Sequence, residues 1–227
     1  MSSFFHKAQH INSFSSRLDI IHRHDNLAEQ ARQYITDIYY KNYHAIINPD
    51  PNILIACREK NSGNLLACTG ISFASPSQPL FSERYLDAPL HNVIFQQTNH
   101  ALLPHQIIEI GSLASDNPAA AADLIRLVPI IAWFMGSKAL LCTSTRRLRK
   151  LLAFHQIPFT VLAEASPEKL SDDERKAWGS YYDQTPQTGV ILLEQCGHLF
   201  NHFCGRLVFS EFENIGHTAL SAAQVAA

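Results

Sequence analysis

The second half of the sequence alternates between short apolar runs and longer helix-like segments, and this alternation limits what the chain can fold into. The strand-like runs lie at 107–114, 139–145, 158–165 and 188–194. Residues 118–136 and 146–156 between them have the length and the apolar spacing of helices. Strands that alternate with helices in this way favour an α/β domain, in which the helices cover the faces of one sheet.

The first half of the sequence adds a helix and a hairpin to this pattern. Apolar residues recur at helical spacing from Leu27 to about Ala45, which predicts one amphipathic helix. The apolar runs 52–59 and 65–75 flank a polar turn and predict two antiparallel strands. Between 76 and 104 we expect one or two short helices. The complete order predicts an α/β fold with a mixed central sheet flanked by helices.

Length and charge limit the organisation and the partners of the chain. Its 227 residues fit one compact domain, and we expect that domain to span 18–195. A loose N-terminal leader at 1–17 would precede it, and a C-terminal extension at 196–227 would follow it. The formal net charge is −2, so no global basic surface favours nucleic acid or an anionic lipid as a partner. None of these features indicates an oligomeric state.

The apolar segments favour a cytoplasmic protein over an exported one. The apolar run near the N-terminus is too short for a secretory signal. The most hydrophobic stretch, 127–142, is interrupted by Lys138 and is shorter than the roughly 20 apolar residues that span a bilayer. Five cysteines without an export signal are most simply reduced, buried thiols. We therefore expect a cytoplasmic location, and the sequence does not indicate membrane association.

Four possible zinc ligands lie close together near the end of the last predicted strand. They are Cys196, His198, His202 and Cys204. Their spacing, C-x-H-x3-H-x-C, is not a usual zinc signature. A helix would place the two histidines on one face and the two cysteines away from them. A chance cluster in a chain with 12 histidines is therefore favoured over a zinc site, and we expect no metal.

Three local strings resemble the thermostable hemolysin family. They are PLFSERYLD at 79–87, IEIGSLAS at 108–115 and WGSYYDQTP at 178–186. The order of elements is also similar to that of GNAT-type acyltransferases and the related acyl-homoserine-lactone synthases. The resemblance covers roughly residues 18–195 and implies a GNAT-like fold. The family usually has Asn where this chain has Ser112, so this chain lacks the side-chain amide that the family has at this position.

The resemblance implies a site for an acyl-pantetheine arm beside the strand 107–114. In the GNAT fold this arm pairs with exposed main-chain groups of that strand, where a bulge separates it from its neighbour. The main chain of Leu113, Ala114 and Ser115 would then bind the donor. Asn117 would begin a helix whose N-terminal dipole points at a phosphate. Simple helix–sheet packing is the alternative explanation of these small residues.

A basic cluster that includes Arg146 and Arg147 begins the following helix. Cations at a helix N-terminus oppose the helix dipole, which indicates a phosphate or an acidic partner such as an acyl carrier protein nearby. A solvated helix face would also explain the cluster. The stretch 107–122 has no glycine-rich loop to cradle a diphosphate. The donor is therefore expected to be a thioester of an acyl carrier protein or of CoA, with no tightly bound cofactor.

Two residues are candidates for proton transfer. Glu109 alternates with Ile108 and Ile110, so it faces the other side of the sheet, and a carboxylate facing a cleft there could deprotonate an amine directly or through water. A structural hydrogen bond to a Tyr or Arg is the alternative. Tyr182 follows a polar segment and could protonate the departing thiolate, or it could pack with Trp178 over the sheet edge.

These features together predict an acyltransferase-like enzyme. It would move an acyl group from a pantetheine thioester to an amine or hydroxyl of a small-molecule acceptor. A membrane-acting hemolysin, as the family description says, and a catalytically inactive GNAT-like binding module are the alternatives. The longest predicted helix fits the buried helix of an α/β core better than an amphipathic lytic element.

Overall fold

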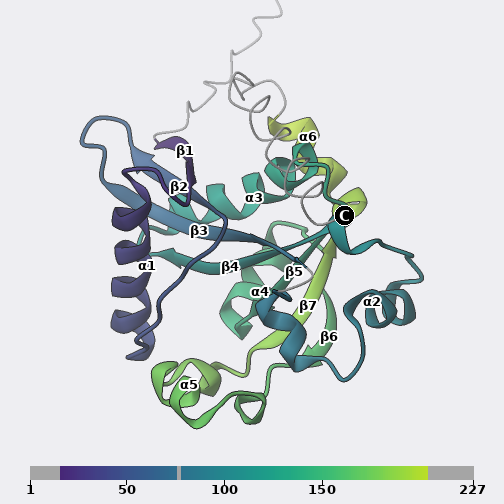
Figure 1. Cartoon of the computed structure of the whole chain (residues 1–227). Helices are drawn as coiled ribbons and strands as arrows, with labels where there is room; N and C mark the ends of the chain where they lie inside the picture. Colours follow the sequence, from purple (N-terminus) through teal and green to yellow (C-terminus); the bar gives the residue numbers. More distant parts are fainter. Residues whose placement is uncertain (1–15, 76–77, 204–227) are drawn as a thin grey trace, which may run out of the picture.

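The computed structural model of the chain describes residues 16–75 and 78–203, which form one mixed sheet with helices on both faces (Figure 1). The sheet has seven strands in the order β1-β2-β3-β4-β5-β7-β6. The strands are β1 (Ser16–His22), β2 (Ile53–Glu59), β3 (Leu65–Phe73), β4 (Ile107–Ser115), β5 (Ala139–Ser144), β6 (Thr160–Glu164) and β7 (Gln187–Leu192). The pair β4–β5 is parallel, and the other neighbouring pairs are antiparallel. The predicted mixed α/β sheet is confirmed.

The helices predicted near 27–45, 118–136 and 146–156 are present in the structure. The α-helices are α1 (Ala28–Tyr43), α2 (Leu90–Thr98), α3 (Pro118–Phe134), α4 (Arg146–Phe154), α5 (Asp172–Ala177) and α6 (Gly197–Phe203). Short 3₁₀ turns are η1 (Phe81–Tyr85), η2 (Pro104–Gln106), η3 (Pro167–Lys169), η4 (Tyr181–Gln184) and η5 (Leu193–Cys196). Within 76–104, η1 and α2 are the expected short helices. The proposed leader and extension lie mostly outside the described residues, so the domain limits stay a prediction.

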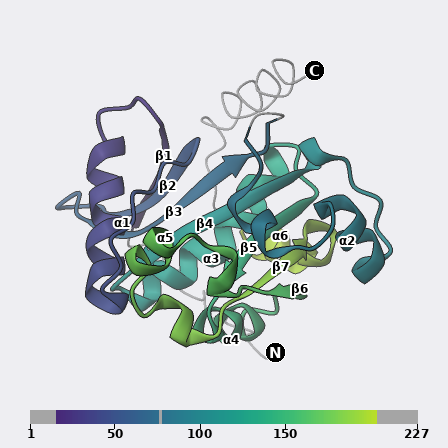
Figure 2. The same cartoon turned by 60° about the horizontal axis from the view of Figure 1, so that its bottom comes forward.

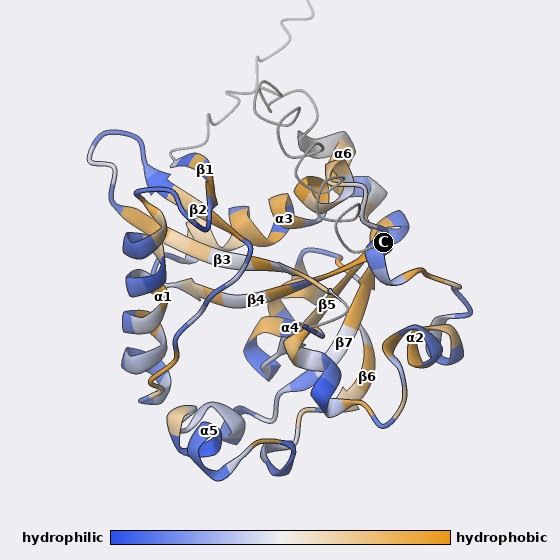
Figure 3. Cartoon of the chain, in the orientation of Figure 1, coloured by the Kyte–Doolittle hydropathy of each residue, from blue (hydrophilic) through white to orange (hydrophobic). Residues whose placement is uncertain are grey.

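The core has one layer on each face of the sheet. Residues of α3, α4 and α6 pack on one face, while α1 and α2 cover the other. Helix α3 is apolar on most sides, as its colour in Figure 3 shows, and Leu124, Ile130 and Ile131 are fully buried. Burying one such side chain contributes about 1.5–3 kcal/mol. No helix in the described part of the chain combines the length and the apolar character that a membrane crossing requires.

A bulge in β4 changes the direction of that strand. Cys68 of β3 pairs with Ala114 and Gly70 with Gly111, so β4 has two residues, Ser112 and Leu113, where β3 has one. Ser112 has a φ of 55°, which lies in the left-handed region. A bulge bends its strand and increases the local twist. The bulge implied by the family resemblance is therefore present, and it lies within the string IEIGSLAS.

The string WGSYYDQTP attaches the segment after α5 to the end of α1. The amide of Ser180 donates to the carbonyl of Tyr43 at 2.8 Å, and the amide of Ile46 donates to the carbonyl of Ala177 at 2.7 Å. Figure 2 shows α5 beside this end of α1. Gly179 has a φ of +52°, and a Cβ added there would lie 2.2 Å from the Tyr43 carbonyl oxygen. The close approach therefore requires glycine.

An ion pair links the turn η1 to helix α5. Glu174 closes a capping box with Ser171 at the start of α5. Arg84 donates from Nη1 to Glu174 Oε1 at 2.8 Å. These hydrogen bonds, first of all the one from Arg84, lower the pKa of the Glu174 carboxyl from 4.5 to about 2. The ionised form of Glu174 is therefore favoured in the folded protein.

The substitution Gly179→Ala is expected to lower the free energy of unfolding by about 2–5 kcal/mol, because it adds a steric clash to a left-handed backbone. Gly197→Ala is the control, since a Cβ there would meet nothing within 4 Å. It should change stability by less than about 1 kcal/mol. Urea denaturation measures both, and equal effects of the two substitutions would contradict this account of Gly179.

Protonation of Glu174 at acid pH is expected to lower the free energy of unfolding. Its folded-state pKa of about 2 lies below the ordinary 4.5, so the contribution is complete above pH 4.5 and is lost as the pH falls toward 2. The difference in unfolding free energy between wild type and Glu174→Gln should therefore narrow over this range. Denaturation at a series of pH values measures it. If the difference in unfolding free energy between the two proteins stayed constant with pH, ionised Glu174 would not contribute to stability as proposed.

Substitutions at Ser112 are expected to follow the cost of its positive φ. Ser112→Gly should be neutral or stabilising by up to about 1 kcal/mol, since glycine adopts this conformation without a Cβ clash. Ser112→Val should be destabilising by about 1–2 kcal/mol, because a β-branched residue is strained there. Thermal unfolding compares the two, and a valine variant as stable as the glycine variant would argue against backbone strain at the bulge.

Candidate functional site

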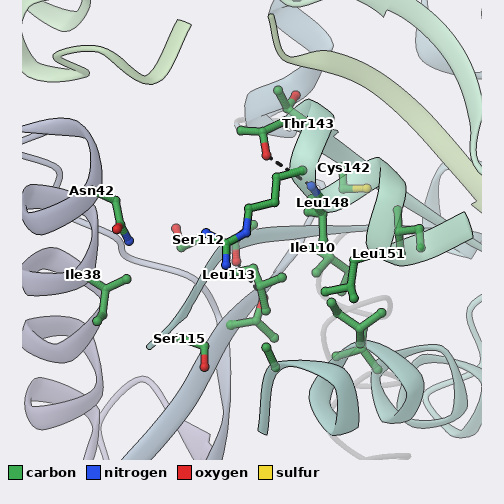
Figure 4. Close-up of a pocket in the computed structure, with 18 of the residues that line it drawn as sticks. Ile38, Asn42, Ile110, Ser112, Leu113, Ser115, Cys142, Thr143, Leu148 and Leu151 are labelled. Atoms are coloured by element: carbon green, nitrogen blue, oxygen red, sulfur yellow. Dashed lines mark hydrogen bonds between the residues drawn. The ribbon is translucent and has the colours of Figure 1, made fainter. Parts of the chain in front are cut away.

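A cavity of about 540 Å³ opens where β4 and β5 separate. The two strands pair at Ile107↔Ala139, Ile108↔Leu140 and Glu109↔Leu141, and their ladder ends there. Beyond it, the wall is formed by β4, β5, α1, α4 and the start of α3 (Figure 4). Residues from both layers of the core line this cavity, so it reaches through the gap in the sheet. Its volume is typical of small-molecule sites.

One end of the pocket is apolar. The lining there comes from α3, α4 and the strands beneath them, and includes Ile125, Val128, Leu140, Leu148, Leu151 and Ile191. In Figure 4, Leu148 and Leu151 of α4 lie across from Ile110 and Leu113 of β4. Cys142 also lines this wall, and burial raises the pKa of its thiol to about 11. This end of the pocket can cover an apolar chain and offers no thiolate.

The mouth of the pocket carries positive charge. Lys41, Arg147 and Lys150 line it, together with one carboxylate, Asp116. Helix α3 begins here, and Asn117 caps it by accepting from the amide of Ala120 at 3.0 Å, which confirms the predicted cap. Cations and a helix N-terminus both favour an anion at this point. The mouth can therefore hold a phosphate group.

Four of the six residues predicted to bind the donor line this pocket: Leu113, Ser115, Asn117 and Arg147. The other two do not. Ala114 is buried in the layer under α1, because the bulge shifts the alternation of β4. Arg146 is exposed, since it lies on the outer side of α4. The hydroxyl oxygen of Ser115 lies 2.7 Å from the carbonyl oxygen of Leu66 and 2.8 Å from that of Asn117, so its one hydrogen can go to either carbonyl.

Glu109 is buried, and it is not among the residues that line the pocket. It faces the opposite side from Ile108, as the alternation predicts. Its Oε2 accepts from the amide of Phe81 at 2.6 Å, and its Oε1 accepts from the amide of Ser82 at 3.0 Å and from the Ser82 hydroxyl at 2.5 Å. Burial raises the pKa of this carboxyl, while the three hydrogen bonds oppose the rise.

Sequence reasoning missed Ser82 and Thr143, which connect Glu109 with the pocket. The Ser82 hydroxyl lies 2.8 Å from the hydroxyl of Thr143. Thr143 of β5 lines the pocket and is labelled in Figure 4. The string PLFSERYLD contains Ser82, so the family resemblance marked this segment without indicating its partner.

Of the two adjacent tyrosines, Tyr181 lines the pocket and Tyr182 does not. Tyr181 is buried, and its ring stacks on Tyr39 with the centroids 6.1 Å apart. The Tyr182 hydroxyl lies 2.5 Å from that of Tyr85. Burial raises the pKa of Tyr182, so its hydroxyl is protonated at neutral pH. Its ring also meets Trp178 edge-on, with centroids 6.1 Å apart.

The Cys/His string at 196–204 is described only in part. Cys196 is buried, and its thiol points to the carbonyl of Leu192 at 3.8 Å. The ring of His198 lies 3.2 Å from the carbonyl oxygen of His155. The side chain of His202 and all of Cys204 lie outside the described residues. Within 16–75 and 78–203, no three His, Cys, Asp or Glu side chains are grouped to hold a metal.

Known structures share this fold. FeeM, an N-acyl amino acid synthase from uncultured soil microbes, matches with a TM-score of 0.52 and 13% identity over 81% of this chain and 98% of that chain. The CoA-dependent acyl-homoserine lactone synthase BjaI, with SAM and isopentyl-CoA, matches with a TM-score of 0.51 and 9% identity over 82% and 89%. A putative arylalkylamine N-acetyltransferase 7 of the yellow fever mosquito Aedes aegypt matches with a TM-score of 0.51 and 12% identity, over 78% of this chain and 87% of that chain. The likeness establishes the GNAT-like fold.

Comparison by sequence adds a family. Residues 21–196 match the model of the family described as thermostable hemolysin. This match covers more than half of the 227 residues, and it includes β4, β5 and every described residue that lines the pocket. No protein with a curated description matches the chain.

Proposed function

The chain belongs to the thermostable hemolysin family, and from its fold and its pocket we propose that it is an acyltransferase. It moves an acyl group from a pantetheine thioester to an amine or hydroxyl acceptor. The observation that carries this proposal is the pocket between β4 and β5, which joins an apolar end to a cationic mouth along an unpaired strand edge. An acyl-pantetheine phosphate has these same three parts in the same order.

The donor arm is proposed to lie along β4. The main chain of β4 continues past Glu109 to Ser115 after its pairing with β5 has ended. The amide groups of a pantetheine arm can pair with such main-chain groups as a β-strand would. Leu113 and Ser115 lie in this stretch at the pocket wall, and Ala114 contributes its main chain between them.

The phosphate is proposed to lie at the mouth, against the start of α3 at Asn117 and the side chain of Arg147. Lys41 and Lys150 add positive charge there. Exposed Arg146, one residue from this mouth, would meet the acidic surface of an acyl carrier protein. Both the carrier-protein thioester and acyl-CoA supply a phosphopantetheine arm. The four described cysteines are free, which fits a reducing, cytoplasmic compartment where such donors occur.

The chemistry follows from positioning and proton transfer. The acceptor nitrogen or oxygen attacks the thioester carbonyl, an amide or ester forms, and the thiol leaves. Holding both reactants in one pocket supplies a large part of the rate acceleration. Glu109 is proposed to take the acceptor's proton through the hydroxyls that separate it from the pocket. Tyr181, which lines the pocket and whose pKa is raised by burial, is proposed in place of Tyr182 to return a proton to the thiolate.

The proposal is tested by thiol release. Octanoyl-CoA and octanoyl–acyl carrier protein are each incubated with the protein and a panel of primary amines and alcohols, and free thiol and acylated product are measured. We expect turnover with at least one pair. Absence of turnover with every pair, together with donor binding, would support an inactive binding module. Dye release from liposomes by the detergent-free protein would support a membrane-acting hemolysin.

Reversing the positive charges at the pocket mouth tests whether the phosphate of the donor binds there. Arg147→Glu combined with Lys150→Glu should raise KM for the octanoyl donor about tenfold or more, because hydrogen bonds to a charged group contribute about 1.5–3 kcal/mol each. Lys60→Glu, which reverses one exposed positive charge in the β2–β3 turn, is the control for a single reversal and should leave KM unchanged. An equal effect of both would show that the mouth does not bind the phosphate.

A further inference from the structure

A row of buried hydroxyl groups leads from the pocket to Glu109. The hydroxyls of Thr188 and Thr143 lie 2.7 Å apart on neighbouring strands. Thr143 lies 2.8 Å from Ser82, and Ser82 lies 2.5 Å from Glu109 Oε1. Ser82 and Thr188 have no exposed surface. Among these groups, Thr143 lines the pocket.

The hydrogens of this row all point one way when Glu109 is ionised. A carboxylate only accepts, so the Ser82 hydroxyl donates its one hydrogen to Glu109. Ser82 must then accept from Thr143, and Thr143 accepts from Thr188. A hydroxyl oxygen can accept two hydrogen bonds. The oxygen of Thr143 therefore keeps one acceptor position, and Thr143 is the member of the row that lines the pocket.

We propose that Thr143 and Ser82 relay a proton from the acceptor in the pocket to Glu109. This inference rests on the proposed acyl transfer. As the acceptor nitrogen bonds to the thioester carbon, its hydrogen passes to Thr143, the Thr143 hydrogen passes to Ser82, and the Ser82 hydrogen passes to Glu109. Each hydroxyl gives one proton and takes one. The carbon–sulfur bond of the thioester breaks and the thiolate leaves, so the net proton change is one lost from nitrogen and one gained by the carboxylate.

The surroundings of Glu109 suit a terminal proton acceptor. Burial raises its pKa, which favours the protonated form that a proton acceptor reaches after the transfer. The titratable groups around it are Glu83, Tyr85 and Cys142. Burial keeps Tyr85 and Cys142 neutral by raising their pKa, and Glu83 adds a further upward push to the pKa of Glu109. Each of these influences favours uptake of a proton by Glu109.

The same hydrogen bonds also hold η1 on the sheet, so a purely structural role is the alternative to proton relay. A variant of Thr188 distinguishes the structural role from the relay. The Thr188 hydroxyl belongs to the row and is fully buried, but it lies beyond Thr143 as seen from Glu109, so no proton on the route crosses it. Loss of the Thr188 hydroxyl removes a buried hydrogen bond like the others and leaves the route complete.

The test measures thiol release from octanoyl-CoA or octanoyl–acyl carrier protein with the amine that turns over fastest in the wild type. Ser82→Ala and Thr143→Val should each lower kcat about 10²-fold, with KM for the donor changed less than about threefold. Thr143→Ser keeps a hydroxyl and should retain most of the activity. Thr188→Val, the matched control, should stay close to wild type. Thermal unfolding of each variant checks that it is folded.

A second measurement uses the wild type alone. A relay moves several protons in one step, so kcat in mixtures of H₂O and D₂O should follow a curved dependence on the deuterium fraction. A linear dependence would overturn the relay even if a variant failed to fold. Equal rates for Ser82→Ala, Thr143→Val and Thr188→Val in a working enzyme would overturn the relay and leave the acyl transfer standing. A wild type without thiol release overturns both.

Discussion

The pocket depends on the early end of the ladder between β4 and β5. Three residue pairs join these strands, and then β4 follows β3 while β5 follows β7. Further pairing would fill the gap with main-chain hydrogen bonds and leave no space for a ligand. Unpaired main-chain groups are costly when they are buried without partners. The bulge at Ser112 and the start of α3 keep this stretch of β4 at the wall of an open pocket, where water or a ligand can supply the partners.

Glu109 lies at the last pair of that ladder and connects it to the segment before α2. Its carboxylate gathers two amides and a hydroxyl at the beginning of η1, and so it fixes a 3₁₀ turn over the place where the strands begin to separate. An ionised group is tolerated in such a place when donors surround it. The carboxylate thus has a structural duty whichever chemical role it performs, and a variant at Glu109 itself would confound the two. Ser82 and Thr143 offer cleaner access to the chemistry, because removing either hydroxyl leaves the two backbone-amide hydrogen bonds to Glu109 in place.

The parts of the structure with local causes could be predicted from the sequence. The period of apolar residues indicated α1 and the β2–β3 hairpin, and Asn117 followed by Pro118 marked the start of α3. The family resemblance correctly implied the sheet and the bulge. Contacts between distant segments could not be predicted this way. The partners of Glu109 lie 27 and 28 residues earlier in the chain, and nothing in their local pattern points to a carboxylate.

The finer assignment of side chains failed for a related reason. The sequence analysis chose Tyr182 as the candidate, but the turn η4 places its neighbour Tyr181 at the pocket instead. The bulge moves Ala114 out of the series that strict alternation would give. Such irregular residues occur where a site interrupts regular structure, so sequence periodicity is least informative at the site itself.

The buried thiol of Cys142 has a consequence for the order of events in the proposed reaction. It is the sulfur at the pocket wall, and its pKa of about 11 keeps it protonated at neutral pH. A protonated thiol is a poor nucleophile, so the protein has no means there of storing the acyl group as a covalent intermediate. Donor and acceptor must then occupy the protein together, which corresponds to a sequential and not a ping-pong mechanism. A thioester bound alone would wait intact until an acceptor arrives.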